Sequence, residues 1–213
     1  MGNVTADFVN DPETFLKSKI VFVPEPPDKK KTGPRDFWFS EDAGVVSLRS
    51  GAPGSGDKVS AYWLSWESKD ATSLTVGGDA GYFFTSQMTG CRFKVLSSDA
   101  KNPKVAHIAG DLSKSERNTK EKALLETVDP SARVKDTGRR LSVSQGMKHG
   151  YTGQVGGRSE DNGSAFVFGV KDGDGNWSFK AQIVKANLAD ENQLKKAVKK
   201  DGVPRIAELY EFK

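Results

Sequence analysis

Few residues in this sequence could do covalent chemistry, because its 213 positions hold one cysteine and two histidines. Cys91 is the only thiol, and His107 follows it in the chain. A thiolate attacks carbonyl carbon well, but a free thiol is mostly protonated at neutral pH. A histidine within hydrogen-bond reach can take that proton and later give it to a departing amine. We therefore consider a Cys91–His107 pair that acts on an amide.

Two further residues complete this candidate site. The Thr85 hydroxyl can accept a hydrogen bond from the far ring nitrogen of His107 and hold one tautomer, although it carries no charge to stabilise an imidazolium. Gly90 lets the backbone approach a substrate closely, and backbone donors at Gly90 and Cys91 are candidates for holding an oxyanion. The expected catalytic residues are therefore Cys91, His107 and Thr85.

A non-catalytic interpretation of the same residues stays open. Free cysteine is commonly buried and inert, and a single histidine is often a satisfied core residue. In that case the chain would be a β-rich binding module in which Cys91 is only packed.

Strand alternation relates the three candidate side chains to one another. In the segments around them, Cys91 shares a face with Phe93, and His107 shares a face with Val105. Thr85 likewise shares a face with Phe83 and Gln87. If these strands are adjacent, one sheet face can carry all three polar side chains among apolar ones.

Short segments rich in aromatic and β-branched residues recur along the chain and predict strands. Two helices are expected at about 115–127 and 189–200, and an exposed, extended Pro/Lys-rich connector at about 24–35. We predict a single domain over residues 1–213, an α+β fold with a β-sandwich core flanked by a few helices. The predicted strands span residues 20–23, 37–39, 45–49, 59–66, 82–86, 91–96, 105–109, 141–144, 165–171, 177–184 and 206–212.

Composition and failed motifs exclude several classes of function. The net charge of +4 comes from basic residues that are spread out, so we expect no nucleic-acid partner. Gly51–Lys58 lacks the spacing of a phosphate loop, and Asp172–Asn176 lacks the Gly and Glu of a calcium loop. With two histidines and one cysteine a zinc site is not expected, and we expect no metal or cofactor.

The N-terminus shows no secretory signal, and no apolar run has membrane-spanning length. We therefore expect a soluble monomer that does not insert into a membrane.

The window Met88-Thr-Gly-Cys91 resembles the catalytic segment of the bacterial glutamine-deamidase toxins, the family of the cytotoxic necrotizing factors and Burkholderia lethal factor 1. These proteins carry a small-residue-Gly-Cys motif at the start of a strand and a histidine on a following strand. In the Burkholderia toxin a threonine precedes the cysteine by six positions, as Thr85 does here. The match covers roughly residues 80 to 110, about a seventh of the chain.

The resemblance implies a β-sandwich flanked by helices and hydrolysis of a glutamine side chain in a protein, with Cys91 as nucleophile. It also implies a toxin or virulence effector, secreted or injected, that acts in the host cytosol. Its substrate would be a host protein such as a Rho-family GTPase or a translation-initiation helicase. Transglutamination and peptide cleavage by the same pair stay open as alternative amide reactions.

Overall fold

The computed structural model describes residues 3–24, 31–51, 56–97, 99–128, 140–142, 164–184, 190–201 and 206–212. Its helices are α1 (Val4–Asn10), α2 (Pro12–Ser18), α3 (Lys114–Glu126) and α4 (Glu191–Asp201). Its strands are β1 (Val21–Phe22), β2 (Gly33–Asp42), β3 (Val45–Ser50), β4 (Val59–Leu64), β5 (Ala71–Thr75), β6 (Tyr82–Thr85), β7 (Arg92–Val95), β8 (Lys104–Ile108), β9 (Arg140–Ser142), β10 (Ser164–Lys171), β11 (Trp177–Val184) and β12 (Ile206–Glu211).

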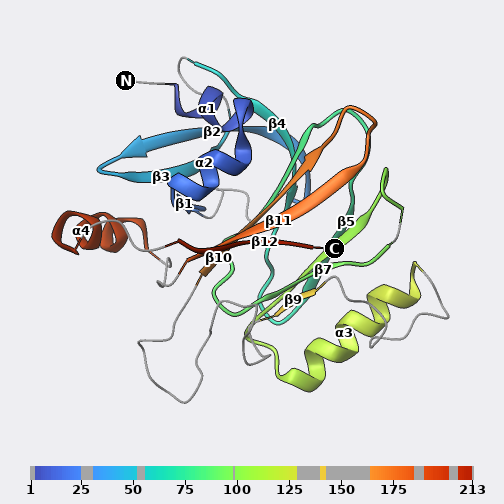
Figure 1. Cartoon of the computed structure of the whole chain (residues 1–213). Helices are drawn as coiled ribbons and strands as arrows, with labels where there is room; N and C mark the ends of the chain where they lie inside the picture. The colour runs from blue at the N-terminus through green and yellow to red at the C-terminus, as the bar shows by residue number, and fades with distance from the viewer. Residues whose placement is uncertain are drawn as a thin grey trace.

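These strands form two sheets, and the fold is α+β and sandwich-like, as the sequence predicts (Figure 1). The larger sheet has eight strands in the order β1-β3-β2-β4-β6-β10-β11-β12, and the smaller has four in the order β5-β8-β7-β9. Two pairs in the larger sheet, β1 with β3 and β4 with β6, are parallel. The smaller sheet is antiparallel throughout.

The larger sheet buries both of its faces, so alternate side chains of its central strands enter different cores. Strand β6 shows this clearly, because Phe83 points to one core and Phe84 to the other. The inner core lies between the sheets and consists of Leu64, Val76, Phe83, Met88, Cys91, Phe93, Val95, Val105, Ala165, Val167, Trp177, Phe179, Ala181, Ile183 and Phe212. The outer core consists of Phe8, Phe15, Leu16, Val21, Val23, Phe37, Phe39, Val46, Leu48, Val59, Ala61, Trp63, Phe84, Phe166 and Phe168.

Two short helices, which the sequence analysis did not predict, cover the outer core. Helix α1 is capped by the Asn3 side chain, which accepts the Ala6 N–H. Helix α2 is capped by Asp11, whose carboxylate accepts the Thr14 N–H at 3.0 Å. A capping side chain followed by proline is a start signal for a helix, so Asp11-Pro12 could have revealed α2.

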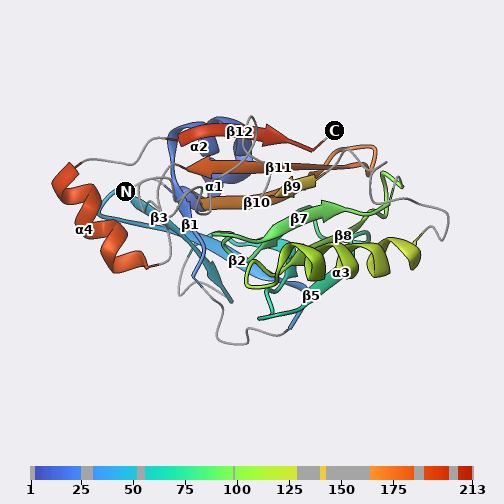
Figure 2. The same ribbon diagram turned by 90° about the horizontal axis from the view of Figure 1, so that it is seen from below.

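Helix α3 covers the smaller sheet on the side opposite to the inner core (Figure 2). It begins with a capping box in which the Ser113 hydroxyl accepts the Glu116 N–H and the Glu116 carboxylate accepts the Ser113 N–H. Helix α3 begins one residue before its predicted start at position 115. Helix α4 begins two residues after its predicted start at position 189.

Strand β2 begins at Gly33, inside the stretch expected to be a connector at 24–35. Its first residues, up to Phe37, pair with β4, and the residues from Phe37 onward pair with β3. Residues 25–30 of that predicted connector lie outside the described residues.

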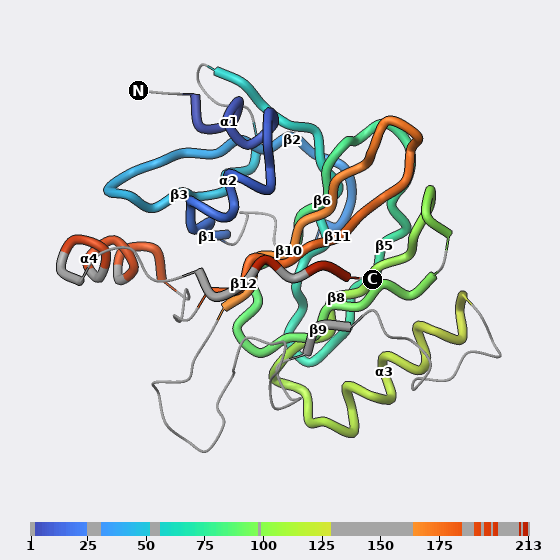
Figure 3. The backbone as a smooth tube through the Cα atoms, viewed as in Figure 1, coloured from blue at the N-terminus to red at the C-terminus, as the bar shows by residue number. Residues whose placement is uncertain are grey.

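The chain crosses between the sheets on either side of β5 (Figure 3). It leaves the larger sheet after β4, pairs with β8 as β5, and returns to the larger sheet as β6 beside β4. It then crosses again to form β7. No helix in the described part of the chain is both long and apolar enough to cross a membrane.

Candidate active site

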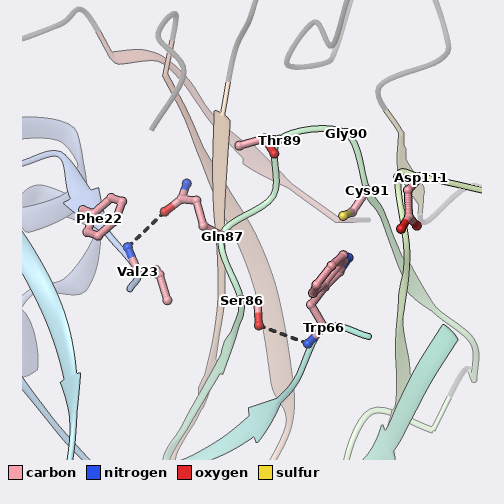
Figure 4. A pocket seen from close by; sticks show the side chains of 10 residues that line it. Phe22, Val23, Trp66, Ser86, Gln87, Thr89, Gly90, Cys91 and Asp111 are labelled. Carbon is pink, nitrogen blue, oxygen red and sulfur yellow. Dashed lines mark hydrogen bonds between the residues drawn. The ribbon is translucent and has the colours of Figure 1, made fainter. Parts of the chain in front are cut away.

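A pocket of about 430 Å³ opens where the chain crosses between the two sheets (Figure 4). Trp66 comes from the crossing that follows β4, and Cys91 comes from the crossing that leads into β7. In Figure 4 the Cys91 sulfur lies above the Trp66 indole ring. The lining residues are Phe22, Val23, Trp66, Ser86, Gln87, Thr89, Gly90, Cys91, Gly110 and Asp111.

Thr85 and His107 do not line this pocket, and they are hydrogen-bonded to each other. The distance from Thr85 Oγ1 to His107 Nδ1 is 2.8 Å, and Thr85 Oγ1 is also 2.7 Å from the Leu64 carbonyl oxygen. A carbonyl oxygen can only accept, so the Thr85 proton is donated to Leu64. Thr85 Oγ1 must then accept from Nδ1–H, which leaves Nε2 of a neutral His107 as an unprotonated acceptor.

The register of the smaller sheet places Cys91 and His107 on one face. His107 lies directly opposite Phe93, and Cys91 precedes Phe93 by two residues. Diagonal neighbours of this kind have Cα atoms roughly 7–8 Å apart, within reach of side chains on the same face. His107 Nε2 is buried and has no hydrogen-bond partner among the described residues. A buried acceptor left in this state suits a general base, which must keep a lone pair for the nucleophile's proton.

Burial sets the protonation states of the pair. Burial raises the pKa of Cys91 to about 12, with a smaller upward contribution from the Asp111 charge; hydrogen bonds from the Gly110 backbone and the Trp66 side chain, and the Arg117 charge, lower it. Burial lowers the pKa of His107 to about 3. Both groups are therefore neutral at pH 7, as a thiol and an imidazole. If Cys91 reacts, its proton must move to His107 during the attack rather than before it.

Two residues that the sequence analysis missed hold the Gly90–Cys91 peptide in place. Arg117 Nη1 on α3 donates to the Gly90 carbonyl oxygen at 3.2 Å. Gly110 is packed so closely that a Cβ atom there would lie 2.5 Å from the Gly90 carbonyl carbon and 2.9 Å from the Cys91 nitrogen. Only a glycine allows this approach. The oxyanion role of the Gly90 and Cys91 backbone stays a prediction.

The sequence analysis also did not identify Ser86 and Asp111, which line the pocket. Ser86 immediately follows Thr85, so the strand that positions the threonine also delivers this hydroxyl. Asp111 follows Gly110 at the end of β8, three positions after the last strand residue. Polar residues just beyond strand ends are a usable signal, because loops positioned by a rigid scaffold often carry binding and catalytic residues.

The described residues contain no group of three or more His, Cys, Asp or Glu side chains that could hold a metal ion. The arrangement offers a thiol in the pocket and, on the same face of the smaller sheet, an imidazole held in one tautomer, and His107 Nε2 is not hydrogen-bonded to the Cys91 sulfur. No model of a known protein family matches this chain, and no curated protein matches it significantly.

Proposed function

We propose that this protein is a cysteine-dependent glutamine deamidase acting on a protein substrate, with Cys91 as nucleophile, His107 as base and Thr85 as orienting residue. One observation carries the proposal: the Thr85–His107 hydrogen bond leaves Nε2 as an acceptor on the sheet face that also carries Cys91. The resemblance of Met88–Cys91 to the deamidase toxins supports glutamine as the amide and a host protein as the target.

The reaction begins with attack of Cys91 Sγ on the carboxamide carbon. The thiol proton passes to His107 Nε2, the S–C bond forms, and the carbonyl electron pair moves onto oxygen. When the oxyanion collapses, the C–N bond breaks and the nitrogen leaves as ammonia with the proton from Nε2. The product of this half-reaction is a thioester.

The second half-reaction hydrolyses the thioester. His107 Nε2 takes a proton from water as the hydroxide oxygen attacks the carbonyl carbon. The C–S bond then breaks, and Sγ recovers its proton from Nε2. Glutamate is released, and both groups return to the neutral state that burial favours.

The experiment treats a host-cell lysate with the wild-type protein or with Cys91→Ser, His107→Gln or Thr85→Val, and maps modified glutamines by mass spectrometry. We expect conversion of glutamine to glutamate with wild type and none with Cys91→Ser. His107→Gln should slow it by about 10²–10⁴-fold, the usual contribution of a general base. Thr85→Val should cost less, because the hydroxyl orients the ring without charge.

The matched control is Thr75→Val, which removes an exposed threonine from β5 in the same small sheet and should keep full activity. Cross-linked glutamines or incorporated amines would instead assign transglutamination. Absence of any Cys91-dependent change would overturn the proposal and favour the second candidate.

That second candidate is a non-catalytic binding module, and the burial of Cys91 is the observation that favours it. The side chain is 7% exposed, belongs to the inner core, and its pKa is raised to about 12 by burial. Such a thiol resembles an inert packed cysteine unless a substrate can reach it through the pocket.

A further inference from the structure

The polar groups of the pocket differ in what they have left to offer a ligand. The Gln87 amide is held in place by the protein, because Oε1 accepts the Val23 N–H at 3.0 Å and Nε2 donates to the Ala165 carbonyl at 3.2 Å. Thr89 is exposed at the edge of the pocket. Ser86 and Asp111 are both anchored by residues that follow β4, and both keep capacity for a ligand.

Ser86 keeps a donor. Its Oγ accepts the Trp66 backbone N–H at 3.1 Å, and the side chain is only 7% exposed. A hydroxyl has one proton besides its acceptor lone pairs. Within the described part of the chain the Ser86 O–H has no acceptor of its own, so its proton is available to a carbonyl oxygen in the pocket.

Asp111 keeps an acceptor site. Oδ2 accepts from the Ser68 hydroxyl at 2.7 Å and Oδ1 from the Lys69 N–H at 2.9 Å, which fixes the carboxylate in place. The Ser68 hydrogen bond holds the pKa of Asp111 below its ordinary value, so the group is charged at neutral pH. A carboxylate offers about four lone-pair sites. Ser68, Lys69 and the Asp111 backbone N–H use three of them, so one stays open for a ligand.

A primary carboxamide presents one carbonyl acceptor and two N–H donors, whereas a carboxylate presents acceptors only. Ser86, Cys91 and Asp111 line the same pocket, and in Figure 4 the Trp66 ring is drawn between Ser86 and the Cys91 sulfur. We propose that Ser86 and Asp111 are the specificity residues of this site, with the Ser86 O–H donating to the substrate carbonyl and the Asp111 carboxylate accepting from the substrate NH₂ group. This inference rests on the proposed function and names its substrate class, a primary carboxamide.

The same pair acts on the product. Hydrolysis turns the NH₂ group, which Asp111 attracts, into a carboxylate oxygen, which Asp111 repels. The acid is therefore released, and the site prefers the amide to the acid that it makes.

The test measures rates of Cys91 alkylation by three probes of similar size: iodoacetamide, N,N-dimethyl-iodoacetamide and iodoacetate. Each rate is divided by the rate at which the same probe alkylates glutathione, which corrects for the different intrinsic reactivities of the three probes. Wild type should favour iodoacetamide over each of the others by about tenfold, the scale of one charge or one good hydrogen bond. The dimethyl probe separates amide recognition from charge repulsion, because it is neutral but has no N–H donor.

Asp111→Asn should bring the iodoacetate rate toward that of iodoacetamide, and Ser86→Ala should lower the iodoacetamide rate. The control Asp172→Asn removes a turn-capping carboxylate of the same kind, which accepts the Asp174 and Asn176 N–H groups, and should change nothing. If Asp111→Asn does not fold, Ser68→Ala loosens the carboxylate while keeping its charge, and should weaken the selectivity for the primary over the dimethyl amide.

Equal normalised rates for all three probes in wild type would overturn the inference, as would unchanged selectivity in Asp111→Asn. The proposed function fails separately, when the lysate shows no Cys91-dependent conversion of glutamine. A selective pocket without that conversion would leave an amide-binding site, whereas conversion without probe selectivity would leave a deamidase that chooses its substrate by other residues.

Discussion

The Thr85 hydroxyl makes two hydrogen bonds, and it must donate in one and accept in the other. The Leu64 carbonyl takes the hydroxyl proton, so the oxygen is left to accept from His107. A backbone carbonyl thus does indirectly what a carboxylate does in other sites, since it decides which ring nitrogen carries the proton. It brings no negative charge, and this agrees with an imidazole that stays neutral when buried.

The depressed pKa of His107 predicts how stability depends on pH. Below pH 6.5 the unfolded chain binds a proton on this histidine, whereas the folded chain stays neutral down to about pH 3. The free energy of unfolding should therefore fall as the pH drops from 6.5 to 5, by up to about 1.4 kcal/mol per pH unit for one proton. His107→Gln should remove that part of the slope, as measured by urea unfolding at several pH values.

The range from pH 6.5 to 5 is chosen because carboxylates titrate mostly below it. The second histidine, His149, is common to both proteins, so its titration cancels in the difference. Identical slopes in wild type and His107→Gln would show that His107 is not held neutral by burial.

The sequence predicted part of this site, because strand alternation is local. It related Cys91 to His107, and the small sheet aligns Phe93 with His107. The expectation that Thr85 shares this sheet face was wrong, because β6 belongs to the larger sheet and Thr85 reaches His107 from there. The loop between Cys91 and His107 does not shift the register of the small sheet, because it is closed at its base by a backbone hydrogen bond. The Leu96 N–H donates to the Lys104 carbonyl oxygen at 2.7 Å. Contacts among Gly110, Gly90 and Arg117 join the ends of different elements, and no local pattern encodes them.

Helix α3 is attached to the smaller sheet by a buried carboxylate. Glu121 forms an ion pair with Arg92 of β7, lies 3.7 Å from Lys94, and all three side chains are fully buried. Arg92 and Lys94 occupy the face of β7 opposite to Phe93 and Val95, so strand alternation sends the charges toward the helix and the apolar groups toward the inner core.

Glu121→Gln should destabilise the protein by about 3–5 kcal/mol, because it removes a buried counter-charge from two buried cations. Glu126→Gln on the same helix is the matched control, since it breaks an exposed pair with Lys122 and should cost less than about 1 kcal/mol. Thermal and urea unfolding measure both. Equal effects of the two variants would contradict a structural role for the buried pair.

Elements were predicted where their pattern was strong and missed where it was weak. Strand β5 was missed because Ala71–Thr75 contains one large apolar residue and is only partly buried. Helices α1 and α2 have seven residues each, too few for an apolar stripe to repeat. Strand β2 was predicted too short because its Gly-Pro start signals a loop, although Pro34 pairs with Tyr62.

At the scale of the whole molecule, one sheet separates two cores with different tasks. The inner core holds Cys91. The outer core includes Phe8, a fully buried residue of α1 that contacts Phe39 and Phe84. Phe8 does not line the pocket, so its loss should lower stability without changing the pocket.

Phe8→Ala should cost about 3–5 kcal/mol in the free energy of unfolding, as large cavities in aromatic cores do. Val9→Ala, at an exposed neighbour on the same helix, should stay within about 0.5 kcal/mol. Under native conditions both variants should keep the wild-type ratio of iodoacetamide to iodoacetate rates at Cys91. A changed ratio in Phe8→Ala would show that the two cores are coupled.

The buried Gln182 side chain adds a constraint on timing. From β11 it accepts the Val21 N–H and donates to the carbonyls of Leu16 and Lys19, contacts that span 161 to 166 positions of the chain. During synthesis, the segment that follows α2 must wait for these partners until nearly the whole chain has left the ribosome. Contacts between distant positions form slowly, because the intervening loop must close first. The first residues made are thus among the last to be fixed, and a growing chain carries Phe8 and Phe15 without their final cover.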